Sequence, residues 1–378
     1  MTYKGKVYDV SGWQEHPGMI YNFAYIVTFL MVYLTYFFFC DLFIFFNTGG
    51  SVIFTHAGDD MTDIFAAFHP PSALRDLQKF EIGELDETII PSALYANKLK
   101  PEKQKAFEKG YRELRAKILA AGLFNANPWF YVYKVLSNFL LLAASVACAT
   151  MTTNIGINMV GAVLLALFWQ QCGWLAHDFL HHQVFKNRAY GDLMGILVGN
   201  VCQGFSVQWW KSKHNAHHAV PNLHASSPDA ADGDPDIDTM PILAWTLRMA
   251  ETAKNSPTGR FLIRWQAFFY FPALLFARLA WAHQSWVFVF GGWGQHSVKG
   301  AKMDQKRMAY PVLEKIGLVL HYAWIFAILR NMPLLNGLAY FMVGQTGCGL
   351  FLAIVFGLGH NGMAVYPADQ VINLTGPL

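Results

Sequence analysis

The chain has 378 residues, of which 54% are hydrophobic and only 14% are charged, and its formal net charge is +3. Soluble globular proteins carry about a quarter of charged residues, so this composition indicates membrane residence. The small net charge gives no argument for a nucleic-acid partner. The five cysteines show no CxxC spacing, and they predict neither a zinc knuckle nor a disulfide framework.

Residues 1–95 are expected to form an N-terminal unit that an apolar segment interrupts. The opening KGKVYDVSGWQEHPG alternates apolar and polar positions, and a helical period follows around Ile64, Phe65 and Phe68. The interruption, residues 19–49, is almost wholly apolar and rich in Phe and Tyr. About 20 apolar residues cross a bilayer, so this segment is long enough to do so. The N-terminus does not have the pattern of a cleaved signal peptide.

Residues 96–127 are charged and have the pattern of an amphipathic linker helix. Phe107, Tyr111 and Leu114 recur at steps of three and four residues. Two interpretations of the helix stay open. Its basic face could lie on anionic lipid headgroups, or the helix could be a solvated linker.

Residues 128–378 are expected to form a multi-pass membrane domain. Apolar runs long enough to cross or deeply enter a bilayer occupy residues 128–150, 156–176, 262–290, 314–330 and 334–358. The stretch 190–210 is interrupted by Gly and Gln, and we expect it at the membrane interface.

Six histidines gather in two clusters that follow apolar runs, and they are the strongest candidates for a functional site. The members are His177, His181 and His182 in the first cluster, and His214, His217 and His218 in the second. Spacings of three and four residues place side chains on one helix face. Two such faces together can hold one metal ion or two. Imidazole suits iron, zinc and copper, so the ligands alone do not name the metal. The alternative is that these are structural histidines without a metal.

The basic residues near both clusters bear on topology. Lys186, Arg188, Lys211 and Lys213 lie beside them, and the positive-inside rule then places the clusters on the cytosolic side.

Three further features are weaker candidates. His360, in a GHNG sequence that ends the last apolar run, is a candidate metal ligand or a capping residue, and Asn222 is a candidate for support of the metal ligands. The acidic sequence PDAADGDPDIDTMP has the pattern of a solvated turn, because it lacks the spacing of a calcium loop.

The N-terminal unit resembles a cytochrome b5 domain. The sequences that carry the likeness are KVYDVSGWQEHPG and GSVIFTHAGDDMTDIFAAFHPPSA. The resemblance implies that His16 and His69 are the two axial ligands of haem b, a group that passes single electrons. Removal of residues 19–49 would join Gly18 to Gly50 and restore the family's HPGG motif. We therefore interpret the segment as a retained intron, and expect it to disrupt haem binding when it is translated.

The whole chain resembles front-end membrane fatty acid desaturases, most closely the fungal Δ6 type. The matching sequences are FWQQCGWLAHDFLHH, CQGFS, WWKSKHNAHH, DPDIDTMP and GHNGM. The resemblance implies a mainly α membrane domain with an N-terminal α+β cytochrome b5-like domain. It also implies two iron ions, held by the six clustered histidines and further ligands.

The implied reaction uses oxygen to insert a double bond into a fatty acyl lipid or acyl-CoA, with electrons from cytochrome b5 reductase. The implied location is the endoplasmic reticulum membrane. The family's third histidine box, QxxHH, does not occur in the 378 residues. We therefore interpret the chain as truncated and expect its desaturase activity to be impaired. Two alternatives stay open: a non-catalytic truncated membrane product, or a related fatty acid or sphingolipid hydroxylase.

Overall fold

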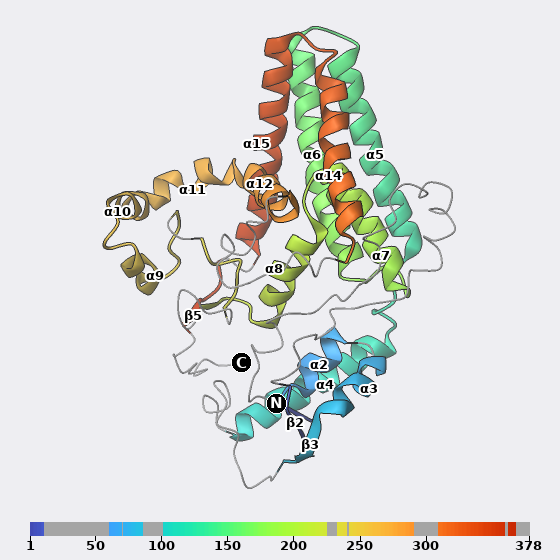
Figure 1. Cartoon of the computed structure of the whole chain (residues 1–378), viewed down its shortest axis with the longest axis vertical. Helices are drawn as coiled ribbons and strands as arrows, with labels where there is room; N and C mark the ends of the chain where they lie inside the picture. Colours follow the sequence, from blue (N-terminus) through green and yellow to red (C-terminus); the bar gives the residue numbers. More distant parts are fainter. Residues whose placement is uncertain are drawn as a thin grey trace.

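The computed structural model describes residues 1–10, 60–69, 71–85, 101–224, 233–239, 242–290, 309–359 and 362–367. It is mostly helical, which confirms the predicted mainly α class. Figure 1 shows four long helices side by side in an upright bundle. They are α5 (Pro128–Thr150), α6 (Ile155–Leu180), α14 (Pro311–Leu329) and α15 (Leu334–Leu358). Each is long and apolar enough to cross a membrane.

Asparagine side chains fix where α5 and α6 begin. Asn127 Oδ1 accepts a hydrogen bond from the backbone N–H of Trp129 at 3.0 Å. Asn154 Oδ1 accepts one from the backbone N–H of Ile157 at 3.2 Å. These caps satisfy N–H groups that have no partner within the helix, so both helices begin next to the predicted apolar runs.

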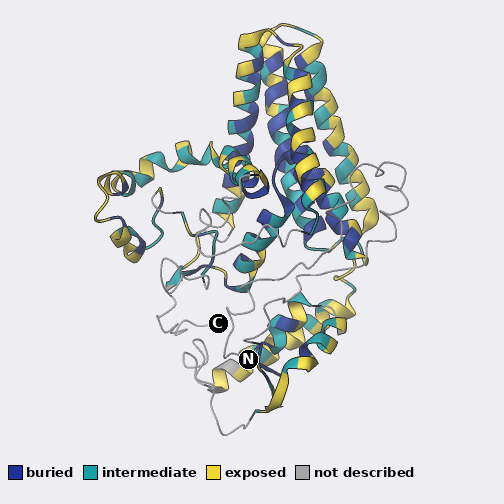
Figure 2. Cartoon of the chain, viewed as in Figure 1, coloured by how far each residue is buried: buried dark blue, intermediate teal, exposed yellow. Residues whose placement is uncertain are grey.

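The bundle buries one side of each helix and exposes the other (Figure 2), and many of the exposed residues are large and apolar. Phe168 and Trp169 of α6 are fully buried, whereas Leu140 of α5 and Leu335 of α15 are largely exposed. An exposed apolar surface of this extent is unfavourable in water and favourable against lipid. The burial pattern therefore fits a bundle surrounded by acyl chains.

The predicted apolar run 262–290 forms two helices instead of one. They are α11 (Gln266–Leu274), with Pro272 inside it, and α12 (Ala277–Phe290), and the pair bends by 66°. The proline removes a backbone donor and favours a break of this kind. The pair is either a broken span or a re-entrant segment. Two short helices precede it, α9 (Leu247–Thr252) and α10 (Pro257–Arg264).

The stretch 190–210, expected at the membrane interface, is largely buried within the protein. It contains most of α7 (Arg188–Gly195) and the π-helical turn η5 (Ile196–Gln203). The turn packs against α6 and α14. A side chain at Gly199 would meet the ring of Phe205 at 2.7 Å, so this glycine allows close packing of the turn.

A buried arginine connects α12 to three other elements. Arg278 is 1% exposed. Its guanidinium donates hydrogen bonds to the side chain of Gln345 on α15 and to the carbonyl oxygen of Gln203, and lies 3.6 Å from the ring centroid of Trp169. These contacts hold α12 against the bundle, because a buried cation needs partners for its donors, although Arg278 Nε has no hydrogen-bond partner in the described structure.

The first described residues form a small α+β unit. Strands β1 (Thr2–Tyr3), β2 (Lys6–Tyr8) and β3 (Glu81–Glu84) pair antiparallel in that order. Helices α2 (Thr62–Phe68) and α3 (Leu74–Leu77) accompany them, and a separate core contains Tyr3, Tyr8, Phe65 and Leu77. The apolar segment 19–49 lies outside the described residues.

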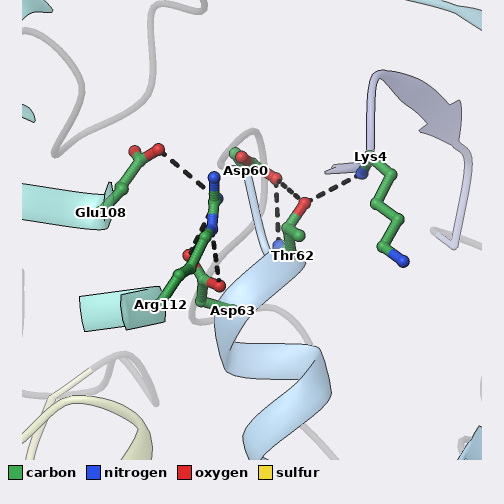
Figure 3. A network of polar contacts seen from close by, with 6 residues as sticks. All are labelled: Lys4, Asp60, Thr62, Asp63, Glu108 and Arg112. Carbon is green, nitrogen blue, oxygen red and sulfur yellow. Dashed lines mark hydrogen bonds and ion pairs between the residues drawn. The ribbon is translucent and has the colours of Figure 1, made fainter. Parts of the chain in front are cut away.

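The predicted linker helix is present as α4 (Pro101–Ala120). Figure 3 shows its Arg112 with Asp63 of α2, where Arg112 Nη2 lies 2.9 Å from Asp63 Oδ2. Phe107 and Leu114 are more than half exposed. The ion pair ties α4 to the α+β unit, and the question of headgroup contact stays open.

Candidate metal centre

The C-terminal end of α6 provides the first two imidazoles of the site. His177 lies in the last turn, and His181 directly follows the helix with its N–H bonded to the carbonyl oxygen of His177 at 2.9 Å. Residues four apart on a helix face the same way. The two ring centroids are 4.4 Å apart.

Helix α8 (Val207–Ala219) provides the next two. The hydroxyl of Ser206 caps its start by accepting a hydrogen bond from the N–H of Trp209 at 3.2 Å. The cap fixes the position of the helix, and His214 and His218 then lie one turn apart on the face toward α6. Their Nε2 atoms are 2.9 Å apart.

These four imidazoles form one cluster, which we call the four-histidine cluster: His177, His181, His214 and His218. Ring centroids lie 5.0 Å apart for His177 and His214, and 4.7 Å apart for His181 and His218. One nitrogen from each residue lies within 4.8 Å of the others. Four nitrogen atoms at this separation can bind one metal ion.

The surroundings keep two members of the cluster, His181 and His214, neutral. Burial, with the neighbouring imidazoles, lowers the pKa of His181 to about 3. Burial and four neighbouring histidines also lower the pKa of His214 far below its ordinary value. Metal binding requires neutral imidazole. In addition, His181 Nε2 is buried and has no hydrogen-bond partner in the described structure. An all-imidazole donor set with an unpartnered nitrogen fits iron, zinc or copper.

His177 is oriented by a carboxylate. Its Nδ1 lies 3.0 Å from Asp178 Oδ1, and the hydroxyl of Tyr131 on α5 donates to Asp178 Oδ2 at 3.1 Å. The ring of Trp210 stacks on His214, with centroids 4.3 Å apart. Such contacts restrict ring rotation and favour a site that is formed before metal arrives.

His182, predicted as a ligand, lies apart from the four-histidine cluster. Its backbone is in the left-handed region, with φ of 56°, which turns the side chain away from that of His181. Its Nε2 lies 3.3 Å from Lys211 Nζ, and Lys211 is also bonded to Asp192. The structure thus places His182 in a separate polar contact with Lys211.

His217 also has a different environment from its neighbours on α8. Its Nδ1 lies 2.9 Å from Asp234 Oδ2 and 3.9 Å from Asp236 Oδ2. Burial lowers the pKa of His217, but the hydrogen bond and charge of Asp234 outweigh this and leave the pKa raised. The expectation of a solvated acidic turn is wrong for Asp234, whose side chain is fully buried. The run DPDIDTMP carried this signal, since it places aspartates a short distance along the chain after the second cluster.

Four candidate residues remain: His16, His69, Asn222 and His360. His16 and His360 lie outside the described residues. His69 stacks on Phe65, with centroids 4.3 Å apart, and its Nδ1 lies 3.3 Å from the Phe65 carbonyl oxygen. The backbone N–H of Asn222 donates to Asp234 Oδ2 at 2.6 Å, so Asn222 supports the carboxylate that contacts His217.

Comparison with known proteins gives the chain its family. Residues 156–376 match the family described as fatty acid desaturase. The chain is 35% identical to an acyl-lipid (9-3)-desaturase of Physcomitrium patens over 97% of its own length and 59% of that protein. It is 33% identical to a Delta(6)-fatty-acid desaturase of Caenorhabditis elegans, over 86% of this chain and 73% of the relative.

A Delta(8)-fatty-acid desaturase of Euglena gracilis is 32% identical, over 86% of this chain and 71% of the relative. The chain thus spans about three fifths of the Physcomitrium patens protein. No solved structure matches. The family match covers nearly all of α6, and α8, α14 and α15 completely, and the chain therefore belongs to the fatty acid desaturase family.

Proposed function

We propose that this chain is a membrane acyl desaturase of the front-end type, which inserts a double bond between an existing double bond and the carboxyl end of a fatty acyl chain. The relatives support the class, because their names describe Δ6, Δ8 and (9-3) desaturation. Among these, we propose Δ6 regiospecificity.

The observation that carries the proposal is the position of the four-histidine cluster. Two of its residues, His177 and His181, lie at the end of α6, a helix long and apolar enough to cross a membrane. Titratable side chains at the edge of an apolar bundle are costly and usually functional. Here they lie close together and are suited to a transition metal.

We propose a non-haem diiron site in which the four-histidine cluster holds one iron, with His217, His182 and His360 as candidates for the second. Iron would supply the oxidising power, drawn from oxygen and two electrons, that removal of hydrogen from a methylene needs. Asp178 holds the His177 ring, and Trp210 holds that of His214. Trp210 also packs against His177 and His181, with ring centroids 5.8 and 5.7 Å away.

The remaining parts of the proposal concern setting and partners. We propose residence in the endoplasmic reticulum membrane with the histidine clusters on the cytosolic side, where Lys186, Arg188 and Lys213 lie nearby. Electrons would come from cytochrome b5 reductase through a haem carried by residues 1–95. The substrate would be a fatty acyl lipid or acyl-CoA.

Expression in a host without front-end desaturases, followed by gas chromatography of its fatty acids, tests the proposal. We expect a new unsaturated product with a Δ6 double bond, in reduced amount because the 378 residues contain no QxxHH box. His181→Ala should abolish it, while His283→Ala, which changes an exposed histidine on α12, should leave it unchanged. A hydroxylated product, or no product from the chain with or without residues 19–49, would contradict the proposal.

A further inference from the structure

The acidic loop after α8 contains Asp234, whose carboxylate contacts one histidine of α8, His217. Asp234 Oδ2 lies 2.9 Å from His217 Nδ1. The Asp234 side chain has no exposed surface, and that of His217 is 9% exposed. An ionised carboxylate only accepts hydrogen bonds, so His217 Nδ1 is the donor in this pair. The nitrogen of His217 that remains suited to a metal is then Nε2.

Backbone groups hold Asp234 in this orientation. Oδ2 also accepts from the N–H of Asn222 at 2.6 Å, and Oδ1 accepts from the N–H of Asp236 at 2.8 Å. The N–H of Asp234 donates to the carbonyl oxygen of Leu223 at 2.7 Å. Three donors therefore fix the carboxylate, two of them from backbone, and leave it little freedom to rotate toward another ligand.

The same loop is tied to the segment that follows the last long helix. Strand β4 (Leu223–His224) pairs in parallel with β5 (Tyr366–Pro367), and the N–H of Tyr366 donates to the carbonyl oxygen of Asn222 at 2.9 Å. Asn222 has a left-handed backbone with φ of 57°, which allows its N–H to reach Asp234 and its carbonyl to reach β5. Asp234 therefore lies where α8 and the segment after α15 meet.

We propose that Asp234 is a positioning residue: its carboxylate holds His217 in the tautomer whose Nε2 binds metal and fixes the angle of the ring. The inference rests on the proposed metal site and deepens it. The contact of Asp234 with His217 parallels the contact of Asp178 with His177. Each of the two helices that carry the histidine clusters therefore has one histidine oriented by a carboxylate. A ligating histidine commonly donates its other N–H to such a partner.

A competing arrangement is a cation bound directly by His217, Asp234 and Asp236, whose ligand atoms lie within 4.8 Å of one another. The hydrogen bonds to both oxygens of Asp234 favour positioning over direct ligation. The two arrangements differ in what they require of Asp236. Positioning needs only its backbone N–H, whereas direct ligation needs its carboxylate.

The test is Co²⁺ binding to the purified full chain in detergent after chelator treatment, followed by the visible absorption of bound Co²⁺. We expect Asp234→Asn to weaken Co²⁺ binding by about 10- to 100-fold and to change the Co²⁺ spectrum. Asp234→Glu, which keeps the carboxylate, should recover part of the affinity. Asp236→Asn is the matched control and should bind Co²⁺ as the unmodified chain does.

The outcomes separate this inference from the proposed function. If the unmodified chain binds no Co²⁺, the metal site fails and the inference falls with it. If it binds Co²⁺ and Asp234→Asn binds equally well with the same spectrum, only the positioning role is overturned. If Asp236→Asn weakens binding as much as Asp234→Asn, direct ligation replaces positioning.

A second measurement covers the case in which Asp234→Asn does not fold. Nitrogen NMR of the metal-free chain with labelled histidine reports the tautomer of His217, whose signal is identified by its loss in His217→Ala. We expect the neutral ring to carry its proton on Nδ1. A neutral ring with its proton on Nε2 would overturn the inference.

Discussion

His214 Nε2 lies 2.9 Å from His218 Nε2 on α8, and both rings face His181 at the end of α6. More than thirty residues separate His181 from His214 in the chain, so the packing of α7, η5 and α8 creates this proximity. The spacing of the histidines along α8 could not by itself bring them close to His181. The arrangement leads to predictions that differ between neighbouring histidines.

His181 and His182 are adjacent, yet replacement of each should have a different effect on metal binding. His181→Ala removes a nitrogen of the four-histidine cluster. It should weaken Co²⁺ binding by more than about 100-fold, which is the upper end of the loss expected when a residue that only supports a ligand is replaced. His182→Ala removes a residue whose Nε2 contacts Lys211 and should weaken binding less. Isothermal titration of the two variants measures the difference. Equal losses would place His182 among the ligands.

The same two histidines should make the metal-free fold sensitive to acid. Burial lowers the pKa of both to about 3, with further lowering by neighbouring histidines at His181 and by Lys211 at His182. In the unfolded chain a histidine takes up its proton near pH 6.5. Below that pH the unfolded state binds more protons, so stability is lost as the pH falls toward about 3.

Thermal unfolding of the metal-free chain in detergent tests whether stability falls with the pH. We expect Tm to fall between about pH 7 and pH 5, and to fall less in His182→Gln, which lacks one of the two groups. A Tm that stays constant or rises over this range in the unmodified chain would contradict the lowered pKa values of His181 and His182.

Removal of the buried cation on α12 should destabilise the bundle. Arg278→Leu would leave the side-chain oxygen of Gln345 and the carbonyl oxygen of Gln203 without their donor. A buried acceptor that loses its donor costs about 1–3 kcal/mol. The free energy of unfolding in detergent measures this cost. Arg260→Leu, at an exposed position on α10, is the control, and an equal effect of both changes would show that the contacts of Arg278 contribute little.

Haem binding by His16 and His69 remains a prediction, and residues 19–49 provide its test. We expect a reduced-minus-oxidised haem spectrum from the chain that lacks residues 19–49, because the deletion restores the HPGG motif. We expect none from the chain that retains them. His69→Ala in the shortened chain should remove the signal. A normal haem spectrum from the unshortened chain would show that the segment is compatible with haem binding.

Apolar runs predicted the long helices well, because length and hydropathy decide a membrane span almost alone. The break within residues 262–290 depended on Pro272 and on packing, which the apolar pattern does not report. The burial of 190–210 was missed for a related reason. Its Gly and Gln residues weaken an apolar pattern, yet Gly199 permits close packing and Gln203 accepts a hydrogen bond from Arg278.

Histidine spacing predicted which residues share a helix face, and it correctly grouped His177 with His181 and His214 with His218 in space. It could not separate His182 from His181, because that depends on a single left-handed residue after the helix. It also could not place Asp234 beside His217, since a contact across 17 residues depends on how the loop folds back. Local pattern thus predicted the cluster, and tertiary structure determined which carboxylates support it.

The most direct test of the account is the iron content of the purified full chain, measured by mass spectrometry and compared with a His177→Ala/His214→Ala double variant and the exposed-site control His283→Ala. The account predicts iron in the unmodified chain and in the control, and its loss from the double variant. Iron absent from the unmodified chain after expression with added iron, or retained by the double variant at the same level, would contradict it.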